Sequence, residues 1–123
     1  MARVRTGVLI SIRGFPRYLE QTLDAVLAQE PDEVVVVDDG SFEPIHSDRV
    51  RVVRRDVTGG PAAARATGLA ALGHVDVVAL CDADDTWEPG SLASLVAGLE
   101  AEPSAVAAFG RALVVGADDR TTG

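Results

Sequence analysis

Three aspartates follow an apolar run within four positions of one another. The run, Val77–Cys81, is typical of a buried strand, and Asp82, Asp84 and Asp85 come directly after it. Like charges this close repel each other and raise each other's pKa unless a cation neutralises them. Carboxylate oxygens at a strand end suit Mg²⁺ or Mn²⁺, and an ion held by one or two of them keeps open positions for a diphosphate. The pattern therefore favours a divalent metal site.

Helix capping is the structural alternative for the same acids. Asp85 or Thr86 could cap a helix that Pro89 opens, and Glu88 would lie favourably at its positive end. A cap needs only one acid, however, so three of them favour the ligand site.

Cys81 is the single cysteine, and it lies inside the expected strand. A small buried hydrophobe is the favoured interpretation over a nucleophile, and one cysteine allows no disulfide within the chain.

The composition predicts one compact domain over residues 1–123, because 47% hydrophobic residues suffice for a core. A net charge of −8 argues against nucleic acid as a partner. All eleven basic residues are arginine, which excludes enzymes that depend on a phosphate-loop, Schiff-base or receiver-domain lysine. With no long apolar leader and no run near the roughly 18 residues of a membrane span, we expect a cytoplasmic protein.

Strand-like and helix-like segments alternate along the chain, which predicts an α/β fold. The expected strands are Gly7–Ile12, Glu33–Val37, Val50–Arg54 and Val77–Cys81. The expected helices are Arg17–Gln29, Ala62–Leu72 with Pro61 at its first position, and Pro89–Glu100, and the tail Asp118–Gly123 is expected to fray. This order predicts a mostly parallel Rossmann-like sheet with Gly7–Ile12 at its centre and helices on both faces.

Polar residues cluster at three of the predicted strand ends: Ser11–Gly14, Asp38–Ser41 and Cys81–Asp85. Ligands of such sheets bind beyond the carboxyl ends of the strands, where the strand order reverses. We therefore expect these three segments to form one binding site. No GxGxxG follows the first strand, so the dinucleotide fingerprint is absent.

Four stretches resemble, in order and spacing, the nucleotide-binding half of the family 2 glycosyltransferases. They are VLISI followed by FPRYLEQTLDAVLAQ, EVVVVDDGS, GGPAAARATGLA and LCDADDTWEPGSL, and they cover Val8 to about Leu99. The resemblance implies a GT-A fold that binds a nucleotide-diphosphate sugar, most simply a UDP-sugar.

The resemblance also implies roles for single residues. Asp39 would accept a hydrogen bond from the base, Asp84 would coordinate the metal, and Asp82 would approach the ribose or the metal. Arg65 would lie near the base or the phosphates. The implied nucleotide-binding set is Ser11, Arg13, Asp38, Asp39, Ser41, Arg65 and Asp82, and the implied metal set is Asp84 and Asp82 with Mn²⁺ or Mg²⁺.

The chain also departs from the family pattern. Ser11-Ile12-Arg13-Gly14 stands where the family usually has Pro-Thr-Tyr-Asn, and Ala66 stands where it usually has asparagine. No residue matches the catalytic base, and the acceptor half is expected to be absent. The leading hypothesis is the donor-binding domain of an inverting glycosyltransferase that uses a divalent metal, with the acceptor unknown.

Two other functions compete with this hypothesis. The first is a non-catalytic module derived from the family, which binds a nucleotide or a metal or serves oligomerisation. An exposed sheet edge would favour a homo-oligomer. A phosphoacceptor receiver domain is the second, and it fails because lysine is missing and the first strand ends without an acid.

Overall fold

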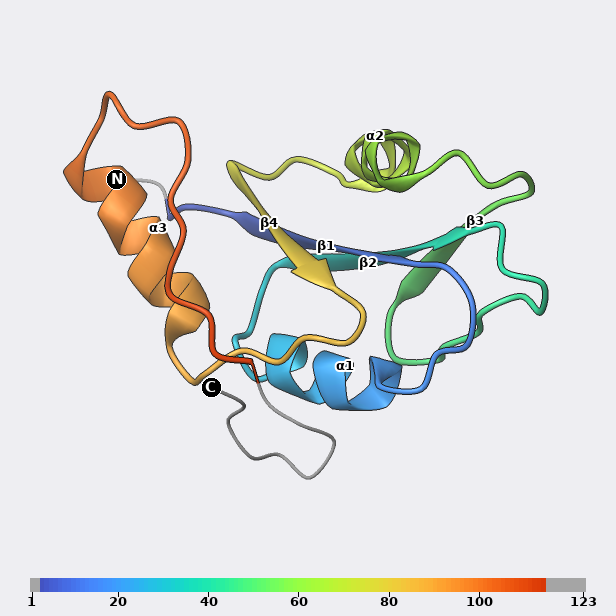
Figure 1. The fold of residues 1–123 in the computed structure, drawn as a ribbon. Helices are drawn as coiled ribbons and strands as arrows, with labels where there is room; N and C mark the ends of the chain where they lie inside the picture. The colour runs from blue at the N-terminus through green and yellow to red at the C-terminus, as the bar shows by residue number, and fades with distance from the viewer. Residues whose placement is uncertain (1–2, 115–123) are drawn as a thin grey trace.

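The structure, a computed structural model, describes residues 3–114 (Figure 1). The tail expected to fray, residues 118–123, lies outside this range. The strands of the structure are β1 (Thr6–Ile12), β2 (Glu33–Asp39), β3 (Arg51–Arg55) and β4 (Val77–Asp82). The helices are α1 (Leu19–Leu27), α2 (Pro61–Ala71) and α3 (Ser91–Ala101).

The four strands form one sheet in the order β3-β2-β1-β4, and every pairing is parallel. The predicted α/β fold with a parallel sheet is confirmed, and β1 lies in the interior of the sheet as expected. Ser11 of β1 is paired with Val37 of β2 on one side and with Asp82 of β4 on the other. The chain therefore reverses its direction of strand addition at β1, which places the switch point between β1 and β4.

Helices cover both faces of the sheet, with α1 on one face and α2 on the other (Figure 1). Successive side chains of β1 point to opposite faces, so Ile10 packs in the cluster with Leu23 of α1 while Leu9 packs in the cluster with Ala64 of α2. Because both faces are covered, β1 and β2 are nearly continuous apolar runs.

The structure corrects the predicted start of the third helix. Pro89 and Gly90 form a turn, Gly90 adopts a left-handed φ of 82°, and α3 begins only at Ser91. The hydroxyl of Ser91 donates to the carbonyl of Glu88 at 2.6 Å. The capping alternative for Asp85 and Thr86 is therefore wrong, because both residues precede the helix by a full turn or more.

Within residues 3–114, no helix is both long and apolar enough to cross a bilayer. Self-association stays a prediction; the outer strand β4 does present Leu80 with 55% of its surface exposed.

Candidate functional site

The carboxyl ends of β1 and β4 border a cleft of about 480 Å³ at the switch point. The loop after β1 forms one wall and the turn after β4 forms the other. The lining residues are Ser11, Ile12, Arg13, Phe15, Pro16, Arg17, Tyr18, Asp82, Ala83 and Asp84. Polar and aromatic groups from two distant segments thus face one hollow, of the size of ordinary ligand pockets, roughly 300–1,000 Å³.

The turn after β4, which we call the acidic turn (Asp82–Asp85), gathers three exposed carboxylates. One carboxylate oxygen from each of Asp82, Asp84 and Asp85 lies within 4.8 Å of the others. The N–H of Asp85 donates to the carbonyl of Asp82 at 3.1 Å, which closes the turn. Desolvation, followed by the charges of Asp82 and Asp84, raises the pKa of the Asp85 carboxyl.

A divalent cation fits this donor set. Hard oxygen ligands are what Mg²⁺ and Mn²⁺ prefer, and a cation would relieve the repulsion that the close approach of the three carboxylates creates. The turn is exposed toward the cleft, so a bound ion would keep coordination positions for a ligand.

Helix α1 holds the backbone of the acidic turn. The hydroxyl of Thr22, which is fully buried, shares its one proton between the carbonyl of Asp85 at 2.7 Å and that of Ala83 at 3.0 Å. Gln29, in the turn that follows α1, donates to the carbonyl of Glu88 at 2.9 Å. The packing of α1 under the sheet therefore fixes where the carboxylates lie.

Cys81 lies beneath the acidic turn and is buried. Desolvation, together with the charges of Asp85, Asp82 and Asp84, raises the pKa of its thiol to about 12. The thiolate is thus scarce at neutral pH, which agrees with a packing role and not with a nucleophile.

Asp38 shapes the turn after β2. Its carboxylate accepts the N–H groups of Ser41 at 3.0 Å and Ile45 at 2.9 Å, and the guanidinium of Arg54 at 2.7 Å. Burial alone would raise the pKa of Asp38, but these hydrogen bonds outweigh burial and lower it. Because Asp38 has no solvent-exposed surface, its role is to hold the turn after β2 in shape.

Asp39 ties the end of β2 to the loop before α2. Its Oδ1 accepts the N–H of Gly59 and the Nε–H of Arg55, both at 3.0 Å, and its Oδ2 accepts the N–H of Gly60 at 2.9 Å. The N–H of Gly59 in particular, with those of Gly60 and Arg55, lowers the pKa of Asp39 against the effect of burial. Among the described contacts, Oδ2 receives a single donor, so this oxygen keeps capacity for another.

The remaining predicted residues fall into two groups. Ser11 and Arg13 line the cleft, whereas Arg65 is exposed on α2 and is not among the lining residues. Ser41 is buried, and its hydroxyl accepts the N–H of Gly14 at 2.9 Å, so it joins the loop after β2 to the loop after β1.

Sequence reasoning missed the two arginines that end β3. Arg54 pairs with Asp38, and Arg55 pairs with Asp39, at the ends of adjacent parallel strands. Two acids at one strand end and two arginines at the next are a usable signal for this pairing, but only once the strand order is known.

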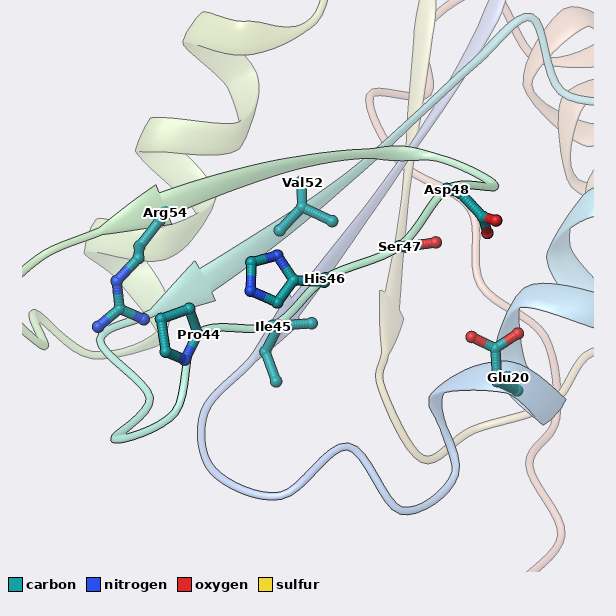
Figure 2. Close-up of a pocket in the computed structure, with 8 residues that line it drawn as sticks. All are labelled: Glu20, Pro44, Ile45, His46, Ser47, Asp48, Val52 and Arg54. Atoms are coloured by element: carbon teal, nitrogen blue, oxygen red, sulfur yellow. The ribbon is translucent and has the colours of Figure 1, made fainter.

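A larger hollow, of about 710 Å³, lies elsewhere, between α1, β3 and the connection from β2 to β3. Figure 2 shows its lining residues, among them Glu20, His46 and Arg54. Glu20 is paired with Arg49 at 2.9 Å, and Arg54 is paired with Asp38 at 2.7 Å. Because these charges are already satisfied, the smaller cleft at the switch point is the better candidate for ligand chemistry.

Comparison with known proteins relates this chain to glycosyltransferases. The family model described as glycosyl transferase family 2 matches residues 8–122. An uncharacterized glycosyltransferase from Nostoc sp. is 33% identical in an alignment of 105 residues, which covers 76% of this chain and 32% of that protein. A glucosyl-dolichyl phosphate glucuronosyltransferase from Haloferax volcanii is 35% identical in an alignment of 119 residues, which covers 87% of this chain and 38% of that protein.

A solved structure shares the fold. It is a mannosyltransferase from Pyrobaculum calidifontis in complex with GDP-Man and Mn²⁺, with a TM-score of 0.67 and 25% identity. The likeness covers 80% of this chain and 33% of that one. The chain thus spans about a third of the length of these relatives.

Proposed function

The chain belongs to glycosyl transferase family 2, and from this premise we propose that it binds the nucleotide-diphosphate-sugar donor of a glycosyl transfer in the cleft beyond β1 and β4. One observation carries the proposal. Three exposed carboxylates within 4.8 Å of one another stand at the topological switch point, and two of them line a cleft with Ser11 and Arg13.

Asp84 and Asp82 would hold Mn²⁺ or Mg²⁺ in this proposal. Such an ion supplies electrostatic neutralisation of the diphosphate as the sugar–phosphate bond breaks. Support comes from the donor set of the acidic turn and from the Mn²⁺ in the complex of the Pyrobaculum mannosyltransferase.

The nucleobase would bind at the carboxyl end of β2. Asp39 keeps acceptor capacity on Oδ2, and Asp38 and Ser41 hold the turn around it. Arg65 on α2 remains a candidate for the base or the phosphates. The similar mannosyltransferase binds GDP-Man, whereas the family resemblance most simply implies a UDP-sugar, so UDP and GDP are both to be tested.

The reaction of the whole protein would be inverting transfer of the sugar to an acceptor hydroxyl. The relatives with assigned activities are glycosyltransferases, so a non-catalytic binding module is the less favoured alternative.

Titration calorimetry of UDP and GDP with Mn²⁺ tests the proposal. We expect metal-dependent binding that falls at least about tenfold in Asp84→Asn, because an ionic ligand is lost. Asp48→Asn is the matched control, since Asp48 is an exposed acid that lines the other hollow (Figure 2). Equal affinities of Asp84→Asn and wild type would overturn the metal assignment, and no binding of either nucleotide would overturn the function.

A further inference from the structure

Among the described residues, some arginine side chains have a hydrogen-bond or ion-pair partner and others have none. In residues 3–114 most of them donate to a carboxylate or a backbone carbonyl; these are Arg3, Arg5, Arg49, Arg51, Arg54 and Arg55. Over the same range, Arg65 and Arg111, which are not among the residues that line the cleft, have no side-chain hydrogen bond or ion pair, and the same holds for Arg13 and Arg17. Arg13 and Arg17 both line the cleft at the switch point.

These two guanidinium groups share the cleft with Asp82 and Asp84 without pairing to them. No ion pair of 4.0 Å or less joins Arg13 or Arg17 to either aspartate in the described part of the chain, so both positive groups and both carboxylates remain available to a ligand. A ligand that carries both a metal-binding group and further negative charge would fit this combination of groups. A nucleoside diphosphate has this chemistry.

The balance of charge at the cleft also favours arginines as partners of a diphosphate. The three carboxylates of the acidic turn, a divalent cation and the diphosphate of a nucleotide sugar, with about two negative charges, sum to a net charge of about −3, which disfavours binding. The chain as a whole is also negative, with a net charge of −8, so the positive charge that offsets this excess must come from arginines close to the ligand. Two arginines at the cleft would reduce the local excess to about −1.

The loop after β1 presents both arginines in a defined way. Gly14, at a left-handed φ of 99°, donates its N–H to the hydroxyl of Ser41 at 2.9 Å, which fixes the chain next to Arg13. The N–H of Arg17 donates to the carbonyl of Phe15 at 2.9 Å, and the guanidinium carbon of Arg17 lies 5.3 Å from the centre of the Tyr18 ring. An arginine stacked on an aromatic ring loses less freedom when it binds an anion.

We propose that Arg13 and Arg17 form a cationic wall that binds the diphosphate of the nucleotide ligand opposite the acidic turn, and that this contact does not require the metal. The inference rests on the proposed function and adds Arg17, and a phosphate role for Arg13, to it. Planar guanidinium groups suit phosphate oxygens because they can donate two parallel hydrogen bonds.

The test compares wild type, Arg13→Gln, Arg17→Gln and the double variant by calorimetry. The probes are UDP and GDP, each against the matching nucleoside, with Mn²⁺ and again with EDTA. Arg51→Gln is the control, because it removes one positive charge at the start of β3, at the opposite edge of the sheet. Circular dichroism confirms that each variant is folded.

We expect each single variant to weaken diphosphate binding several-fold and the double variant about tenfold or more, with nucleoside binding unchanged. In EDTA the loss in the double variant should persist, whereas Asp84→Asn should bind the diphosphate at least as well as wild type, because a repelling carboxylate is gone. A wild type that binds the diphosphate with metal and a double variant of equal affinity would overturn the cationic wall and leave the proposed function standing. A wild type that binds neither diphosphate would overturn both.

Discussion

The hydroxyl of Thr22 donates a hydrogen bond of 2.7 Å to the backbone carbonyl of Asp85. The two residues are 63 positions apart, and the bond joins the first helix to the turn that carries the carboxylates. The position of the proposed metal ligands thus depends on a buried polar side chain of a helix that does not itself reach the cleft.

Thr22→Val should therefore uncouple the acidic turn from α1. Valine keeps the shape, but two carbonyls lose their donor, so we expect a loss of about 1–3 kcal/mol in the free energy of unfolding. Mn²⁺-dependent nucleotide binding should weaken as well. Urea denaturation and calorimetry measure the two effects, and Gln21→Ala, an exposed neighbour on the same helix, should change neither. Full stability of Thr22→Val would mean that the turn holds its shape unaided.

Gly68 of α2 lies so close to β1 that a side chain there would force Leu9 to shift. A Cβ there would stand 2.5 Å from Cδ1 of Leu9, whose side chain is buried. Gly68→Ala should gain about 1 kcal/mol of helix propensity but lose more through overpacking, typically about 1–3 kcal/mol. The net change in the free energy of unfolding of Gly68→Ala is therefore expected to lie between zero and a loss of about 2 kcal/mol.

Gly98→Ala in α3 is the matched control, because no atom lies within 4 Å of the added Cβ. This variant should be more stable than wild type by about 0.5–1 kcal/mol. Urea denaturation of both variants decides, and stabilisation of equal size in Gly68→Ala would show that Leu9 moves aside without cost.

Asp32 makes the stability of the fold depend on pH. The guanidinium of Arg3, with the N–H of Thr6, lowers the pKa of Asp32 to about 2. A carboxyl whose folded pKa lies below its unfolded value stabilises the fold above the unfolded pKa of about 4, and loses that contribution as pH falls toward about 2. Asp32→Asn should therefore be less stable than wild type at pH 7, with the gap closing between pH 4 and pH 2. A gap in urea midpoint that is constant with pH would contradict this role.

The strands of the sheet could be predicted because burial on both faces leaves a nearly continuous apolar run, as in Glu33–Asp39. The start of α3 could not, since Pro89 is compatible both with a first helical turn and with the Pro-Gly turn that it forms. The support of the site was also hidden. Arg54 meets Asp38 only through the register of β2 and β3, and Thr22 meets Ala83 across 61 positions. Contacts of this kind follow from the three-dimensional arrangement and leave no local pattern.

Inverting transfer needs a general base to take the proton of the acceptor hydroxyl, and among the described residues the carboxylates at the cleft all belong to the acidic turn. In the proposed function Asp82 and Asp84 would hold the metal, and a carboxylate bound to a cation, or close to one as Asp85 would be, is a weak base. His46 lines the other hollow (Figure 2), and His74 lies just before β4, at the amino edge of the sheet.

We therefore expect the 123-residue chain on its own to bind a nucleotide sugar but to transfer none. Incubation with a panel of UDP- and GDP-sugars, Mn²⁺ and mixed acceptors should release UDP or GDP at the same slow rate with and without acceptor, because water remains the only available nucleophile. Asp84→Asn distinguishes hydrolysis at this cleft from a contaminant, since it should abolish the slow release. Acceptor-dependent release well above this background that is lost in Asp84→Asn would show that a base within these residues serves the reaction, and Asp85, the third carboxylate of the acidic turn, would be the first side chain to replace.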